Sequence, residues 1–382
     1  MPYRYIGGNI VMKKSSIIAL LLAVIMVFCA CGTTATPATS APATETPTTP
    51  ASEVPVAETP SEEPTAEALF KAAMVTDING VNDHGFNQGA WAGLQACSEE
   101  GWASVKYLES KQEADYAANL GTLSDEGNDI IWGVGYLMAD AMKNAATVNP
   151  DNLYAIVDNA YDTIPPNMVC LVFDSQDCSF LVGYIAGRMT ETNNVGVVGG
   201  VKGAIIDSFE YGYRAGVAYA AKELGKEITV QVEYANSFSD EAKGKEIATS
   251  MFKKGADIVF QAAGSTGTGV IEAAKELDKW AIGADIDQNY LAPENVLTSA
   301  LKDVGAGIYD VNKSIKDGEK LGSTIYTGTL ANGAVGYSPS TSDHVPAEII
   351  KATDAIKEKI IAGEIVAPVN EEEFNTFVEA LS

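Results

Sequence analysis

From about residue 69 onward, short runs of apolar residues alternate with segments in which apolar positions recur every three to four residues. The short runs are continuously apolar, which is typical of strands buried on both faces of a parallel sheet. The predicted strands are residues 72–76, 105–108, 129–132, 153–157, 169–173, 195–198, 229–234, 257–261 and 281–284. The predicted helices are residues 87–99, 114–124, 137–146, 180–189, 207–224, 241–254 and 269–277. This number of strands is larger than one doubly wound sheet usually contains. The pattern therefore predicts an α/β chain with two similar lobes.

The pattern differs near the start of the chain, where one uncharged apolar run covers residues 17–30. Lys13 and Lys14 precede it, as in the positive segment of an export signal, and the run is short for a membrane-spanning helix. We therefore predict that residues 1–31 are a signal peptide. Because a methionine directly precedes the two lysines, residues 1–11 resemble an artefact of an upstream start site.

The predicted signal ends in a sequence that resembles a bacterial lipobox, Cys29-Ala30-Cys31-Gly32. Small residues flank Cys31 on both sides, so Cys31 is the candidate for lipidation. A palmitate-type chain there would anchor the exported domain to the extracytoplasmic face of the cell membrane. A plain secretory signal with incidental cysteines is the alternative.

Residues 32–67 have a different composition, dominated by Thr, Ala, Pro, Ser and Glu. They contain seven of the 15 prolines and no aromatic residue. Such a stretch buries too little apolar surface to offset the entropy lost on ordering it. We predict a disordered linker between the anchor and the folded domain.

Charge excludes one class of partner. The chain has 25 basic and 51 acidic residues, a net charge of −26, and −23 of this falls after residue 67. A nucleic-acid-binding domain needs a basic face, so we predict no nucleic-acid partner. With only 2 histidines, the sequence also predicts no metal site.

Aspartates and glycines occur where the predicted strands end. Asp77, Asp158 and Asp285 each follow a strand, and three other strands run into glycine-rich turns, one of which contains Gly264. In parallel sheets, ligands bind beyond the carboxyl ends of the strands. Such residues are also common in ordinary turns. The whole set, rather than any single position, therefore predicts a binding site for a polyol or an amine.

Two phenylalanines lie at the same edges. Phe86 comes shortly after the first predicted strand, and Phe238 follows the strand at residues 229–234. Rings from two opposing lobes would sandwich a planar base, with stacking worth roughly 1–3 kcal/mol per base. The alternative for a single loop phenylalanine is a local core contact.

A series of short motifs spans the domain from about residue 70 to 310. In chain order they are Val75-Thr76-Asp77, Asp83-His84-Gly85-Phe86-Asn87-Gln88-Gly89-Ala90-Trp91, Asp115-Tyr116, Asn119-Leu120, Gly199-Gly200, Gly212-Tyr213, Ala215-Gly216-Val217, Ser237-Phe238-Ser239-Asp240, Gly255-Ala256-Asp257, Ala262-Ala263-Gly264, Thr266-Gly267, Asp285-Ile286-Asp287-Gln288, Val296-Leu297-Thr298-Ser299 and Lys302. Together they resemble the basic membrane protein (BMP) family, the PnrA-like substrate-binding lipoproteins of nucleoside ABC transporters. The family usually reads Asp-Lys-Ser-Phe-Asn where this chain has His84 and Gly85, a departure that bears on base selectivity more than on fold.

The resemblance implies a type I periplasmic-binding-protein fold, with two Rossmann-like lobes, parallel sheets and a three-crossing hinge. Lobe 1 is expected at about 68–174 and 297–335, and lobe 2 at about 175–296 and 336–382. The ligand is expected in the cleft between the lobes.

The resemblance also implies a purine nucleoside as ligand and assigns roles to residues. Those expected to stack on the base are Phe86 and Phe238. Those expected to contact the base or line its end of the pocket are Asp77, Asn87 and Asp158. Those expected to hold the ribose hydroxyls are Gly264, Asp285 and Lys302, because a carboxylate accepts two vicinal hydroxyls and a nearby lysine keeps it ionised. The implied protein partners are an ABC transporter permease and its ATPase, with no cofactor and no catalytic residue.

Two other functions remain open. The segment Ala263-Gly264-Ser265-Thr266-Gly267 resembles a degraded nucleophile elbow, and Asp285 and His344 follow Ser265 in the order of a serine hydrolase. Ala263 stands in place of the first glycine, which argues against this reading. A receptor of the same fold for a sugar or another small metabolite is the second alternative, and it would not need two base-stacking rings.

Three cysteines lie in the predicted domain: Cys97, Cys170 and Cys178. An odd number leaves at least one thiol free. We interpret all three as small buried apolar side chains, with a Cys170–Cys178 pair left open.

Overall fold

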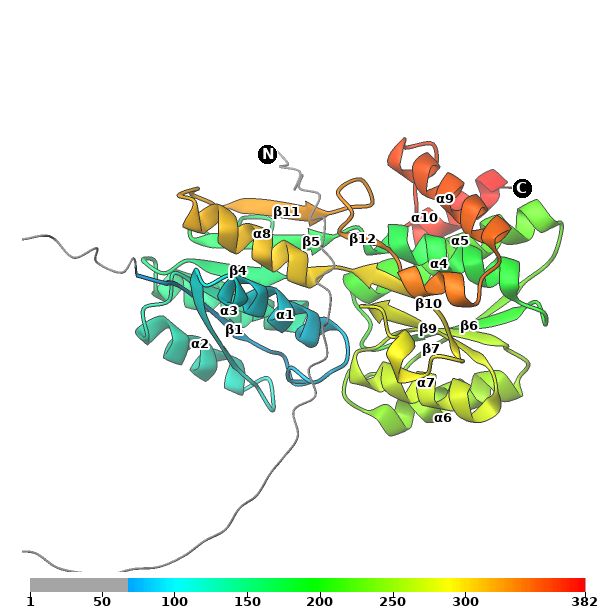
Figure 1. Ribbon diagram of the computed structural model, residues 1–382, viewed down its shortest axis with the longest axis horizontal. Helices are drawn as coiled ribbons and strands as arrows, with labels where there is room; N and C mark the ends of the chain where they lie inside the picture. Colours follow the sequence, from blue (N-terminus) through cyan, green and yellow to red (C-terminus); the bar gives the residue numbers. More distant parts are fainter. Residues whose placement is uncertain (1–67, 382) are drawn as a thin grey trace, which may run out of the picture. The chain divides into compact units, whose positions relative to one another are not determined.

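The computed structural model describes residues 68–381 (Figure 1). The predicted signal peptide, the lipidation candidate Cys31 and the predicted linker lie outside the described residues. Within residues 68–381, no helix has the length and apolar character needed to cross a membrane.

The first lobe is built on a six-stranded sheet with the order β11-β5-β4-β3-β1-β2. All neighbouring strands in it are parallel. The strands are β1 (Phe70–Val75), β2 (Ala103–Leu108), β3 (Ile130–Val134), β4 (Tyr154–Val157), β5 (Met168–Phe173) and β11 (Thr324–Gly328). Every residue of the central strand β3 is buried, because helices cover both faces of the sheet.

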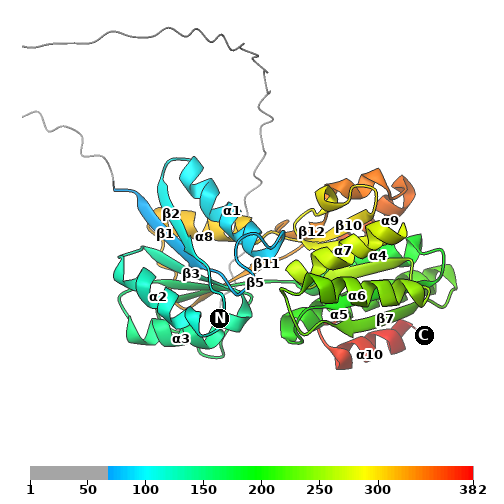
Figure 2. The ribbon, with the colours of Figure 1, turned by 90° about the horizontal axis from the view of Figure 1, so that it is seen from below.

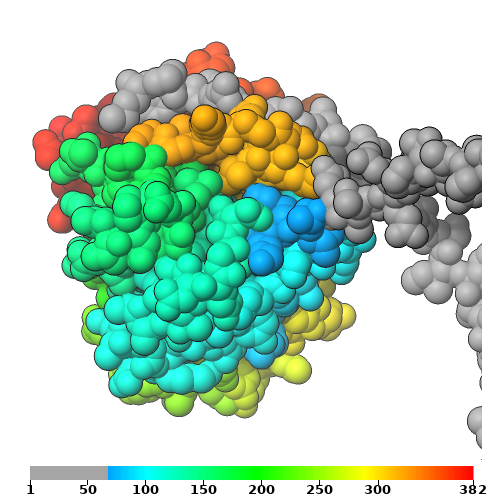
Figure 3. Space-filling model, turned by 90° about the vertical axis from the view of Figure 1, so that its left-hand side faces the viewer, coloured from blue at the N-terminus to red at the C-terminus, as the bar shows by residue number. Residues whose placement is uncertain are grey.

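The helices of this lobe come from two distant parts of the chain. One face of the sheet is covered by α1 (Phe86–Glu99) and α8 (Val304–Lys316), and the other by α2 (Asp115–Asp125) and α3 (Ala139–Val148) (Figure 2). Figure 3 shows the late segment, in orange, directly beside the start of the domain, in blue. The first lobe is therefore completed by a return of the chain after most of the second lobe.

The second lobe has a similar sheet with the order β12-β10-β9-β8-β6-β7. Its strands are β6 (Asn194–Gly199), β7 (Thr229–Tyr234), β8 (Ile258–Ala262), β9 (Trp280–Asp285), β10 (Val296–Lys302) and β12 (Val335–Tyr337). Only the β10–β12 pair among these strands is antiparallel. The helices are α4 (Ser175–Met189), α5 (Ala204–Leu224), α6 (Glu241–Lys253), α7 (Ser265–Leu277), α9 (Ala347–Ile361) and α10 (Glu371–Leu381), with short 3-10 turns η2 (Asn289–Leu291) and η3 (Pro339–Asp343) here and η1 (Tyr136–Met138) in the first lobe.

Helices α4 and α5 pack closely because glycines lie at their contact. A Cβ on Gly216 would overlap the carbonyl oxygen of Phe180, and one on Gly183 would overlap the carbonyl oxygen of Tyr213. Gly216 belongs to a motif noted in the sequence, and the structure gives it a packing role. Helix α5 of this pair carries Phe209, which lines the cavity described below.

The chain passes between the two sheets three times: from β5 to α4, from β10 to α8, and from β11 to β12. The two-lobed α/β fold with three crossings is therefore confirmed. One boundary differs from expectation, because β10 pairs in parallel with β9. Residues 296–302 thus extend the second sheet, and the return to the first lobe begins at α8 rather than at residue 297.

The three cysteines of the domain are buried and unpaired: Cys97, Cys170 and Cys178. Burial raises the pKa of the Cys170 thiol to about 11, so this thiol stays protonated near neutral pH. The interpretation of the three as apolar core side chains is confirmed, and the optional Cys170–Cys178 disulfide is absent.

Candidate functional site

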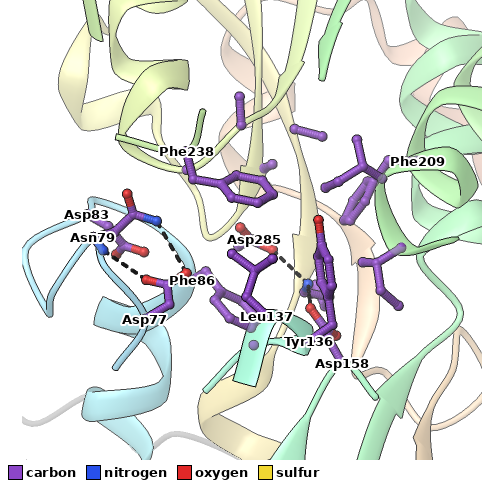
Figure 4. Close-up of a pocket in the computed structure, with 18 residues that line it drawn as sticks. Asp77, Asn79, Asp83, Phe86, Tyr136, Leu137, Asp158, Phe209, Phe238 and Asp285 are labelled. Carbon is purple, nitrogen blue, oxygen red and sulfur yellow. Dashed lines mark hydrogen bonds and ion pairs between the residues drawn. The ribbon is translucent and has the colours of Figure 1, made fainter. Parts of the chain in front are cut away.

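A cavity with about 540 Å³ of empty volume lies between the two lobes (Figure 4). Seven of the eight predicted ligand residues line it, and the eighth, Asn87, lies directly behind Asp77. The lining residues are Asp77, Asn79, Asp83, Phe86, Gly135, Tyr136, Leu137 and Asp158 from the first lobe, and Ile205, Ile206, Phe209, Phe238, Ala262, Ala263, Gly264, Ala284, Asp285 and Lys302 from the second.

Lys302, at the end of β10, is the charged centre of the cavity. Its Nζ lies 2.7 Å from Asp158 Oδ2 and 3.3 Å from Asp285 Oδ1. Burial lowers the pKa of Lys302, but the two carboxylates raise it by more, so the net shift is upward and the ammonium stays charged. Because Asp158 follows β4 and Lys302 ends β10, this ion pair joins the two lobes.

The two aspartates have an unusual backbone that directs their side chains. Asp158 has a φ of 63° and Asp285 a φ of 66°, in the left-handed region that aspartate tolerates better than most residues. Within residues 68–381, Oδ1 of each is buried and has no hydrogen-bond partner, although Asp285 Oδ1 is near the Lys302 ammonium. Asp158, Asp285 and Lys302, which we call the Lys302 cluster, therefore present acceptor oxygens beside a cation. This arrangement suits neighbouring hydroxyl groups of a ligand.

The two predicted stacking rings lie on opposite sides of the cavity. Figure 4 shows the ring of Phe238, from the loop after β7, above the cavity and the ring of Phe86, from the start of α1, below it. The Lys302 Nζ is 4.5 Å from the centroid of the Phe86 ring, and Tyr136 contacts the Phe238 ring edge-on at 6.3 Å. These neighbours orient both rings across a space that a planar group could enter.

The loop that carries Phe238 is held by the start of α7. The Thr266 N–H donates to the carbonyl oxygen of Phe238, and the Thr266 hydroxyl donates to the carbonyl oxygen of Ser237. Gly264 has a φ of +56°, and a Cβ there would lie 3.1 Å from the Phe238 carbonyl oxygen. Gly264 thus permits the close approach of two loops, while Thr266, which belongs to one of the sequence motifs but had no assigned role, positions the ring.

A second polar cluster, which we call the amide cluster, consists of Asp77, Asn79, Asp83 and Asn87. Asp77 Oδ1 accepts hydrogen bonds from the Asn79 backbone N–H and from Asn87 Nδ2, at 3.0 and 2.8 Å. Burial raises the pKa of Asp77 to about 6, although these hydrogen bonds oppose the shift. Asp83 accepts three backbone N–H groups at the start of α1 and one from Asn87 Nδ2, so it fixes the helix end and the Asn87 amide together.

The structure divides one group of residues that the resemblance placed together. Asp77, Asn87 and Asp158 were expected together at the base end of the pocket. The structure instead pairs Asp158 with Lys302, while Asp77 and Asn87 belong to the amide cluster. The two clusters lie on opposite sides of the Phe86 ring in Figure 4.

The residues of the hydrolase alternative have separate partners. Ser265 begins α7, Asp285 is paired with Lys302, and His344 has its Nε2 2.6 Å from the carbonyl oxygen of Pro293. The His344 ring also packs on Trp280 at 4.9 Å. This arrangement gives Ser265 no base of the kind that a triad requires among the described residues.

Several lining residues were missed by sequence reasoning. Tyr136 donates from its hydroxyl to the carbonyl oxygen of Val201 in the other lobe, at 3.1 Å. The Gly135-Tyr136 turn is one of the three glycine-rich turns noted at strand ends in the sequence, but Tyr136 itself was given no role there. Phe209 lies within a long helix, where its spacing is indistinguishable from that of a core residue.

Comparison with known proteins agrees with this geometry. Residues 70–371 match the family described as ABC transporter substrate-binding protein, PnrA-like. The chain is 41% identical over 320 residues to the CD4+ T-cell-stimulating antigen of Listeria innocua, a match that covers 78% of this chain and 88% of that one. It is 39% identical over 319 residues to the ABC transporter nucleoside-binding protein BmpA of Lactococcus lactis, covering 78% and 89% of the two chains.

Solved structures agree on the fold. A solute-binding protein of an ABC transporter system from Aeropyrum pernix superposes with a TM-score of 0.74 at 24% identity, covering 82% of this chain and 97% of the other. At that identity the likeness concerns the fold alone. The extent of the family match nevertheless decides the assignment: the chain belongs to the PnrA-like, or basic membrane protein, family of ABC transporter substrate-binding proteins.

Proposed function

We propose that this protein binds purine nucleosides in the cavity between its lobes and delivers them to the permease of an ABC importer, without converting them chemically. The base would stack between Phe86 and Phe238, with its edge toward Asp77 and Asn87. The ribose would lie against Lys302, Asp158 and Asp285. The nucleoside-binding name of the Lactococcus lactis relative supports this choice of ligand.

The observation that carries the proposal is a buried cation between two carboxylates, next to an aromatic ring. Lys302 is 3% exposed, Asp158 4% and Asp285 13%. Burying three charges is costly unless further hydrogen bonds satisfy them, and Asp158 Oδ1, which has no partner among the described residues, is left to accept a hydrogen bond from a ligand. Two vicinal hydroxyls attached to a flat apolar group would satisfy both the carboxylates and the rings.

The aromatic walls of the cavity favour a nucleoside over a bare sugar. A pentose would engage the Lys302 cluster but leave Phe86, Phe238 and the amide cluster without a partner. Stacking of a base on aromatic rings adds roughly 1–3 kcal/mol per base, which a pentose lacks.

We further propose that the protein acts at the extracytoplasmic face of the membrane, anchored through an acyl chain on Cys31, with residues 32–67 as the linker. This rests on the lipobox-like sequence and on the composition of that segment. A permease and its ATPase would be the partners, as the transporter family implies.

Thermal unfolding with a ligand panel tests the proposal. Adenosine, guanosine and inosine are compared with ribose and glucose, each across a range of concentrations. Saturating nucleoside should stabilise the protein by about 2.7 kcal/mol at a hundredfold excess over Kd. A shift with ribose or glucose and none with any nucleoside would instead favour the sugar receptor.

A further inference from the structure

The amide cluster contains two acceptor atoms that no donor satisfies. Within residues 68–381, Oδ1 of Asn79 and Oδ1 of Asn87 are buried and have no hydrogen-bond partner. Buried polar atoms are paired in most proteins, so two such oxygens, on amides that both donate to Asp77, call for an explanation. Neither residue makes a further contact that would satisfy its oxygen, whereas both amide nitrogens are engaged.

The orientation of both amides is fixed by carboxylates. Asn79 Nδ2 lies 3.3 Å from Asp77 Oδ2, and Asn87 Nδ2 lies 2.8 Å from Asp77 Oδ1 and 3.1 Å from Asp83 Oδ2. Rotating either amide by 180° would bring an oxygen against a carboxylate oxygen, which is repulsive. The two free acceptors are therefore the oxygens, and a ligand group that meets them must donate.

Asn79 lies at the face of the first lobe that meets the second. It lines the cavity, and a Cβ built on Gly264 would lie 3.5 Å from Asn79 Nδ2. Gly264 in turn touches the loop of Phe238. The Asn79 side chain is thus close to the edge of any planar group that stacks on the Phe238 ring.

We propose that Asn79 is a specificity-determining residue, which together with Asn87 selects a base that carries an exocyclic amino group. The inference rests on the proposed nucleoside function. An amino group adds two N–H donors, enough for both amide oxygens, whereas the edge of hypoxanthine offers a single donor, N1–H, beside a 6-oxo acceptor. A base without an amino group leaves a buried oxygen unpaired, which should weaken binding about tenfold or more.

Two matched pairs of nucleosides test this by titration calorimetry. Guanosine and inosine differ only in the 2-amino group, and adenosine and purine riboside differ only in the 6-amino group. In the unmodified protein, at least one pair should show about tenfold tighter binding of the amino-bearing member. In Asn79→Ala, that preference should fall several-fold, while the amino-free member still binds, which shows that the variant is folded.

The control is Asn82→Ala, because Asn82 is an exposed asparagine of the same loop and should leave both ratios unchanged. Failure of every nucleoside to bind would overturn the proposed function itself. Binding of all four nucleosides with both ratios near one would overturn the amino-group selectivity but leave the function standing. A clear preference that persists unchanged in Asn79→Ala would overturn the role of Asn79.

Discussion

Replacing Lys302 by methionine probes the charged centre of the cavity most sharply. Methionine keeps much of the apolar length of the lysine side chain but removes the ammonium. Asp158 and Asp285 would then remain as neighbouring buried carboxylates without a cation, on side chains that are 4% and 13% exposed. Removing one partner of a buried ion pair costs about 3–5 kcal/mol, so we expect Lys302→Met to lower the free energy of unfolding by an amount in that range.

The matched control is an ion pair of the same length on the surface. Lys106 and Glu126 are also 2.7 Å apart, but their side chains are 42% and 40% exposed. Lys106→Met should therefore cost at most about 1 kcal/mol. Urea unfolding of the three proteins at neutral pH, monitored by circular dichroism, gives the two differences, and equal m values establish that the transitions are comparable.

The pH dependence provides a second readout. Burial raises the pKa of Asp158 and Lys302 opposes that shift, so removing Lys302 leaves the pKa of Asp158 further above its unfolded value. Groups with a raised pKa in the folded state lose stability as the pH rises, so the deficit of Lys302→Met should be large at pH 7 and shrink toward pH 4. If Lys302→Met loses no more stability than Lys106→Met, or if its deficit does not change with pH, the assigned role of Lys302 is wrong.

Three further predictions concern the rings, the amide cluster and the anchor. Phe238→Ala should weaken nucleoside binding by about 1–3 kcal/mol in calorimetry, and an unchanged affinity would remove the ring from the site. Because burial raises the folded-state pKa of Asp77 from 3.8 to about 6, its ionisation should cost on the order of 3 kcal/mol of stability as the pH rises from 4 to 7. Asp77→Asn should lack that loss in urea unfolding, and parallel pH profiles for the two proteins would contradict it. Cys31→Ser should abolish metabolic labelling with palmitate and release the protein from membranes. Labelling that persists in Cys31→Ser and is lost in Cys29→Ser would show that Cys29 is the lipidated residue instead.

Sequence patterns predicted most of the fold because parallel strands buried on both faces leave continuous apolar runs. Strands β1 to β9 left such runs, and helices α1 to α7 left apolar positions that recur every three to four residues. Residues 297–302 had no predicted strand and were placed in lobe 1 from the resemblance alone, whereas they form β10 in the second sheet, since a short apolar segment does not encode which sheet it joins. That choice depends on its pairing with β9, a contact that only the folded chain contains.

The candidate site was predicted where residues lie at strand ends and missed where they lie inside helices. Asp77, Asp158 and Asp285 followed from their positions after strands, and the structure brings all three to the cavity. Asn79 was not predicted as a site residue because asparagine is common in turns, so its position after a strand does not by itself indicate a ligand contact. Its importance comes from an unpaired oxygen, which is a property of three-dimensional contacts.

Titration calorimetry of the protein with guanosine, and separately with ribose, tests the central claim most directly. The account predicts one nucleoside bound per chain with a negative heat-capacity change, because Phe86 and Phe238 bury the base, and much weaker binding of ribose. Ribose binding as tight as guanosine binding would contradict it, as would the absence of binding by guanosine, adenosine and inosine alike.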